Sequence, residues 1–129
     1  MSVAKQLSVF LENKPGVMAR LCHSLAEQKI NLQGLCVSDT VDHAVVRLIT
    51  SDPTRARSLL ESHGVLVVET DVLALSLPDR PGELGRVAGK LAKARINIEY
   101  AYGTTGDSST ILILRVSDLK KALKVLKAK

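Results

Sequence analysis

Hydrophobic and polar positions follow one pattern along the chain, and the pattern occurs twice. In each half, alternating apolar residues predict a β-strand, and apolar residues three or four positions apart then predict a helix. The alternating residues are Leu7, Val9 and Leu11, and then Leu73, Leu75 and Leu77. The helical residues are Met18, Leu21, Cys22 and Leu25, and then Leu84, Val87, Ala88 and Leu91. An offset of 66 residues aligns the halves without a gap, so we interpret the chain as a duplication.

Further strands and a second helix complete the repeating unit. We expect second strands at 32–38 and 98–104 and third strands at 44–50 and 110–116, joined by polar turns at 39–42 and 105–108. Asp52 and Pro53 suit the N-cap and first turn of a helix, and Gly64 suits its left-handed end. A fourth strand is predicted at 65–68. The order βαββαβ predicts an α+β fold of two ferredoxin-like units in tandem, each with its helices on one face of an antiparallel sheet.

The two predicted units differ at their ends. We expect one unit over residues 1–70 and the other over 71–129. The last helix, predicted at 119–127, is followed by no segment that would form a fourth strand, so the second unit is expected to lack its C-terminal strand. Since an unpaired sheet edge is usually covered, either the stretch 65–77 pairs across the boundary or another chain supplies the missing strand.

The third strands are apolar on both faces. Val46 and Leu48 are expected to face the helices, which leaves Ile49 on the other face of the sheet. Ile111 and Ile113 take the outward positions in the second half. These residues are either ordinary surface hydrophobes or part of an interface between sheets, and their presence in both halves favours an interface.

A proline-glycine pair stands between the first strand and the first helix of each half. Free N–H groups at a helix start can hold a carboxylate, and Gly16 and Gly82 let a ligand approach the backbone closely. Asp79 beside the second pair could bind an ammonium group, so this loop could bind both charges of a free amino acid. The residues alone favour a simpler interpretation, a turn into a helix with Asn13 or Asp79 as a cap.

The segments 13–21 and 79–87 resemble the signature of the ACT domain, in which an acidic or amide residue precedes Pro-Gly and an amphipathic helix. Each helix is followed by the Ile-Asn-apolar ending that this signature carries, at 30–32 and 96–98. The resemblance covers nearly the whole chain, twice. It implies a non-catalytic regulatory protein that binds an amino acid at an interface between ACT units. It also implies a homodimer and a regulated enzyme partner. The alternative is an accessory subunit of an amino-acid-metabolism enzyme that binds no ligand.

The resemblance also implies ligand-binding residues in both halves. The second half matches the signature better, with Asp79, Arg80, Pro81, Gly82, Glu83, Leu84 and Asn97. Its counterpart in the first half consists of Asn13, Lys14, Pro15, Gly16, Val17, Met18 and Asn31. Asn31 and Asn97 allow two interpretations, because an asparagine after a helix can take the left-handed turn or direct its amide at a ligand.

Composition and charge narrow the classes of function. The formal net charge is +5, and lysines gather in the last predicted helix, but only 2% of the residues are aromatic. This argues against a protein that stacks nucleic-acid bases on aromatic side chains. No apolar run reaches the roughly 20 residues of a membrane helix, and the N-terminus has no signal-peptide core, so we expect a cytoplasmic protein.

Few residues suggest metal or catalytic chemistry. The candidate metal ligands are Cys22, His23, Cys36 and His43, and their spacing matches no familiar ligand pair. The two cysteines also provide no disulfide framework. No phosphate-binding loop or catalytic constellation is recognisable. We therefore expect no metal, no cofactor and no enzyme activity.

Overall fold

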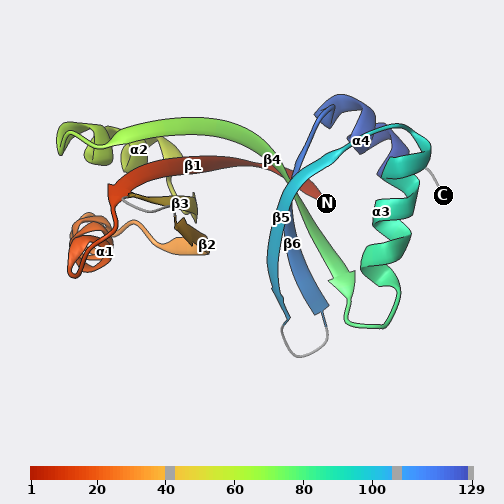
Figure 1. The fold of residues 1–129 in the computed structure, drawn as a ribbon, viewed down its shortest axis with the longest axis horizontal. Helices are drawn as coiled ribbons and strands as arrows, with labels where there is room; N and C mark the ends of the chain where they lie inside the picture. The colour runs from red at the N-terminus through yellow and green to blue at the C-terminus, as the bar shows by residue number, and fades with distance from the viewer. Residues whose placement is uncertain (40–42, 106–108, 128–129) are drawn as a thin grey trace. The chain divides into compact units, whose positions relative to one another are not determined.

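The computed structural model describes residues 1–39, 43–105 and 109–127 (Figure 1). The predicted polar turns fall largely on 40–42 and 106–108, outside the described residues. In chain order the elements are β1 (Ser2–Glu12), α1 (Val17–Glu27), β2 (Leu32–Asp39), β3 (His43–Thr50), α2 (Pro53–Ser62), β4 (Leu66–Pro78), α3 (Glu83–Lys93), β5 (Ile98–Thr105), β6 (Ser109–Val116) and α4 (Leu119–Lys127). The predicted α+β class is confirmed, with antiparallel strand pairing. The chain divides into two compact units.

The first unit comprises Lys5–Thr70. Its strands are hydrogen-bonded in the order β2-β3-β1-β4, and both pairs of neighbours with a defined register, β1–β3 and β2–β3, are antiparallel. Leu7 pairs with Leu48, and Val9 with Val46, so these four side chains share one face. Leucines of α1 and α2 pack on that face and complete a buried apolar core. This is the strand order and layering of a ferredoxin-like unit.

The second unit comprises Asp71–Lys129 together with Met1–Ala4. Here the strands follow the order β1-β4-β6-β5, and β4 pairs with β6 through Leu73–Leu114 and Leu75–Leu112. These leucines pack with Val87 and Leu91 of α3 and Ala122 of α4. The edge that β4 occupies in the first unit is occupied here by the start of β1, so the N-terminal residues of the same chain stand in the place of a fourth strand.

The long strand β4 replaces two strands that the sequence pattern predicts separately, at 65–68 and around Leu73–Leu77. No glycine or proline interrupts the chain between Leu66 and Leu77, and the middle of this stretch contains the β-branched residues Val67, Val68, Thr70 and Val72. Because such residues favour extended backbone, one continuous strand forms. The same strand thereby contributes to both units.

The start of α2 forms as predicted. The Asp52 side chain accepts a hydrogen bond from the Arg55 N–H at 3.1 Å, with Pro53 in the first turn. Gly64 follows the helix with a φ of 78°, so the predicted left-handed position is also confirmed.

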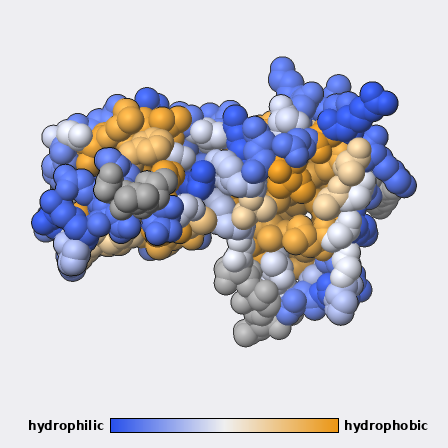
Figure 2. All heavy atoms as spheres, in the orientation of Figure 1, coloured by the Kyte–Doolittle hydropathy of each residue, from blue (hydrophilic) through white to orange (hydrophobic). Residues whose placement is uncertain are grey.

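The outward face of the third strands is unevenly buried. Ile49 and Ile113 are buried, whereas Ile111 is 52% exposed. Other large apolar side chains are exposed as well, including Leu66 at 65%, and Figure 2 shows apolar side chains at the surface of each unit. The interface between sheets therefore stays a prediction.

Candidate functional site

The junction between strand and helix has the same geometry in both units. Gly16 and Gly82 are the N-caps of α1 and α3, with φ values of 87° and 90°. A side chain is rarely accommodated at such φ, which accounts for glycine at both positions. Neither helix start has a side-chain cap, so Asn13 and Asp79 do not take the capping role considered from the sequence. The first helical N–H of each helix donates to a loop carbonyl at 3.4 Å, from Val17 to Lys14 and from Glu83 to Arg80, which leaves the next two N–H groups of each first turn available to an anion.

The second unit has a small cavity at this junction, with a volume of about 100 Å³. It is lined by Leu77, Pro78, Asp79, Arg80, Glu83, Leu84, Thr110 and Leu112. Four of the predicted site residues thus lie together, whereas Pro81, Gly82 and Asn97 do not line the cavity. Sites for whole small molecules usually have about 300 Å³ or more, so this cavity fits one functional group of a ligand.

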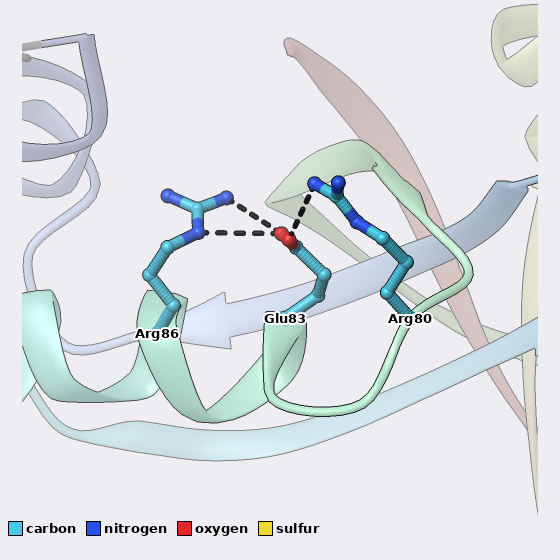
Figure 3. A network of polar contacts seen from close by, with 3 residues as sticks. All are labelled: Arg80, Glu83 and Arg86. Carbon is cyan, nitrogen blue, oxygen red and sulfur yellow. Dashed lines mark hydrogen bonds and ion pairs between the residues drawn. The ribbon is translucent and has the colours of Figure 1, made fainter.

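Glu83 is held by two arginines at the start of α3 (Figure 3). Arg80 donates to one carboxylate oxygen at 2.9 Å, and Arg86 donates to the other at 3.0 and 3.2 Å. These hydrogen bonds, that from Arg86 foremost, lower the pKa of Glu83 although partial burial opposes the shift. An ionised carboxylate in the first helical turn also interacts favourably with the helix dipole. The carboxylate of Glu83 thus already neutralises part of the positive charge of Arg80 and Arg86.

Asp79 is available to a cation. Its side chain is exposed and makes no hydrogen bond or ion pair with any residue that the structure describes. Asp79 is among the residues that line the small cavity, as is Arg80. A ligand's ammonium group could bind there without displacing an existing partner.

The first unit has a larger cavity, of about 530 Å³. It is lined by Phe10, Leu11, Glu12, Lys14, Val17, Arg20, Leu21, Ser24, Leu60, His63, Gly64 and Val65. Of the predicted residues only Lys14 and Val17 line it, and Asn13, Pro15, Gly16, Met18 and Asn31 do not. Met18 instead packs against the core. The larger cavity therefore lies along α1 and toward the end of α2, away from most of the predicted site.

Several lining residues were missed by the sequence argument. Arg20, Ser24 and His63 line the larger cavity, and none of them was assigned a role from the sequence. The repeat alignment does contain a signal, since Val17 stands at the position of Glu83 while the arginines match. The second junction therefore has a carboxylate beside its arginines, and the first junction has an uncharged side chain at the same position.

Asn31 and Asn97 have a backbone role in both units. The N–H of Asn31 donates to Ser51 Oγ at 2.9 Å, and the Ser51 N–H donates back to the Asn31 carbonyl at 2.9 Å. Asn97 and Ser117 repeat the pair at 2.9 and 3.0 Å. The expected left-handed conformation falls earlier, on Lys29 and Arg95, with φ of 58° and 60°. These residues lie just after the helix ends, where the chain reverses direction.

Within residues 1–39, 43–105 and 109–127, no three histidine, cysteine or acidic side chains lie close enough together to hold a metal ion. Over these same ranges, no helix has the length and apolar character needed to cross a bilayer.

The chain thus consists of two ferredoxin-like units, each with an uncapped glycine turn leading into its first helix. The family model described as an ACT domain pair matches residues 1–129, and the chain belongs to this family. ACT domains are regulatory, and no catalytic family is indicated.

Solved structures of related proteins share the fold. Protein BT0572 from Bacteroides thetaiotaomicron is 39% identical, with a TM-score of 0.93 over 97% of this chain and 87% of that chain. The regulatory subunit of aspartate kinase from Thermus thermophilus is 16% identical, with a TM-score of 0.74 over 98% of this chain and 96% of that chain. The corresponding subunit from Thermus flavus is 19% identical, with a TM-score of 0.70 over 99% and 94%. No curated protein matches the sequence.

Proposed function

We propose that this ACT domain pair is a non-catalytic sensor that binds a free amino acid and regulates an enzyme of amino-acid metabolism. The amino acid would bind at the strand-to-helix junctions, where ACT units meet in a homodimer. Its carboxylate would bind to helix N–H groups, and its ammonium group to Asp79. The free thiols of Cys22 and Cys36 are consistent with a reducing compartment, so we propose a cytoplasmic location.

One observation carries this proposal: an unpaired carboxylate, Asp79, lies beside an uncapped helix start that follows a left-handed glycine. The Asp79 carboxylate can bind a positive group, and the N–H groups at the start of α3, in the same loop, can bind a negative group. A zwitterion presents both complementary charges, whereas a simple anion or amine presents one. The same turn geometry at Gly16 supports a second, weaker site in the first unit, where Asn13 replaces the acid.

A thermal-shift screen against the twenty common amino acids tests the proposal. A ligand present at about 100 times its dissociation constant adds about 2.7 kcal/mol of stability. For a chain of this length we expect the melting temperature to rise by roughly 10 °C. The response should be lost in Asp79→Ala and retained in Asp71→Ala, which removes an acid elsewhere in the same unit. A cooperative unfolding transition that no amino acid shifts would contradict the proposal.

The alternative function is an accessory subunit that binds no ligand. The bridge from Glu83 to Arg80 and Arg86 favours it, because an internal carboxylate already neutralises part of the positive charge at the junction. In that case the screen stays flat. Co-purification would instead recover an enzyme whose activity depends on this chain.

A further inference from the structure

The two junctions differ in whether an acidic side chain pairs with their arginines. In the second unit, Glu83 binds both Arg80 and Arg86. In the first unit the corresponding position is Val17, which has no charge to offer. Lys14 pairs there with Glu12 at 2.7 Å instead. The arginine at position 20 is therefore left without the acidic partner that its counterpart has.

Arg20 retains its full hydrogen-bonding capacity. Its guanidinium makes no ion pair or hydrogen bond with another residue in the described part of the chain, and it only adds a minor attraction that lowers the pKa of Glu12. Hydrogen bonding to Lys14 is the main cause of that lowered pKa. Glu12 is thus ionised and already paired, so it does not compensate Arg20.

The larger cavity of the first unit lies beside Arg20. Ser24 and His63 add a hydroxyl and a ring nitrogen to its wall, and their side chains have no hydrogen-bond partner among the described residues. Leu21, Leu60 and other apolar side chains line the rest. The volume of about 530 Å³ falls within the usual range for sites that bind small molecules.

We propose that this cavity is a second ligand site, which binds a small monocarboxylate with an aliphatic or aromatic body. Arg20 binds the carboxylate, with Ser24 and His63 as further polar partners, and the apolar wall buries the body. A single uncompensated arginine matches a single negative charge, and a planar guanidinium binds a carboxylate in bidentate fashion. Inorganic phosphate is a poorer match because apolar side chains such as Leu21, Leu60 and Val65 line much of the wall. The proposal does not depend on amino-acid binding at Asp79.

The test is an NMR titration of the full chain with isocaproate, a branched aliphatic monocarboxylate that carries no ammonium group. We expect the backbone amide signals of Arg20, Ser24 and Gly64 to shift with saturation. Isocaproamide has the same body without the charge, and we expect at least about tenfold weaker binding for it. Equal binding of acid and amide, or isocaproate shifts confined to other parts of the chain, would overturn the proposal.

Variants test the role of the arginine. Arg20→Gln should weaken isocaproate binding at least about tenfold. Val17→Glu should have the same effect, because it installs the internal carboxylate that Glu83 provides in the other unit. The matched control is Arg57→Gln, which removes an arginine of the same unit that pairs with Glu61 and Glu69 outside the cavity. Unchanged binding in Arg20→Gln, or an equal loss in Arg57→Gln, would refute the assignment.

The monocarboxylate site can be tested independently of the proposed amino-acid site. Asp79→Ala should leave isocaproate binding intact while it removes the response to an amino acid. Arg20→Gln should do the reverse. A failure of one site would therefore be seen independently of the other.

Discussion

Gly103 in β5 tests whether the strand packing of the second unit is as close as the structure describes. A methyl group added at Gly103 would lie 2.5 Å from the backbone oxygen of Ile111 and 2.7 Å from Leu112 Cδ2. Real Cβ atoms essentially never come so close to other atoms, and a backbone oxygen in a paired strand has little freedom to move. Gly103→Ala must therefore displace β5 or β6.

Gly103→Ala is expected to destabilise the fold because it overpacks the contact between β5 and β6. Forcing an extra methyl into a close-packed site typically costs about 1–3 kcal/mol. Gly89→Ala in α3 is the matched control, because nothing lies within 4 Å of the added methyl group. Alanine is better than glycine within a helix by about 1 kcal/mol, so this variant should be stabilised. The same change from glycine to alanine is thus expected to lower the free energy of unfolding at Gly103 and to raise it at Gly89.

Urea and thermal denaturation followed by circular dichroism measure the free energy of unfolding and the melting temperature of both variants. Gly103→Ala should lower the free energy of unfolding, and its melting temperature should fall by about 5–10 °C. Gly89→Ala should raise both quantities. A Gly103→Ala protein as stable as the parent would show that β5 and β6 do not pack at the distances given, and the steric argument would be refuted.

Three further outcomes are expected. Asp52→Ala removes the cap of α2 and should lower stability by about 1 kcal/mol in thermal unfolding, whereas an unchanged value would mean that the cap contributes nothing. The lowered pKa of Glu83 means that its ionised form stabilises the fold above the ordinary value of 4.5 and that this contribution is lost as the pH falls through the lowered pKa. Stability should therefore depend less on acid pH in Glu83→Gln, and parallel pH profiles would contradict this. Removal of Ser2, Val3 and Ala4 should increase hydrogen exchange along the part of β4 in the second unit, and no increase would mean that the N-terminal residues do not protect that edge.

Most of the elements could be predicted from the sequence because their signals are local. Alternation at Leu7, Val9 and Leu11, and helical spacing around Leu21 and Leu25, depend only on which side of an element is buried. Caps and turns such as Asp52 act within a few residues. The duplication strengthened each of these predictions, since these strands, helices and the Asp52 cap each have a second copy at the same offset.

The candidate site was predicted only in part. The junction residues were found from the motif, and Asp79, Arg80, Glu83 and Leu84 do lie together. Their pairing could not be predicted, because whether Glu83 reaches two arginines or solvent depends on side-chain positions in space. The larger cavity combines residues from β1, α1 and the end of α2, which no local pattern connects.

Local patterns in the chain are therefore enough to predict the repeat, the order of the elements and the glycine turns before α1 and α3, because each of these depends on neighbours within one element or turn. Strand pairing in the folded protein makes β4 one strand that serves both units and places the start of β1 beside β4 in the second unit. Strand pairing joins segments far apart in the chain. Which strands pair depends on the sheet edges that remain unpaired once the helices have packed. No single segment of the sequence specifies those edges.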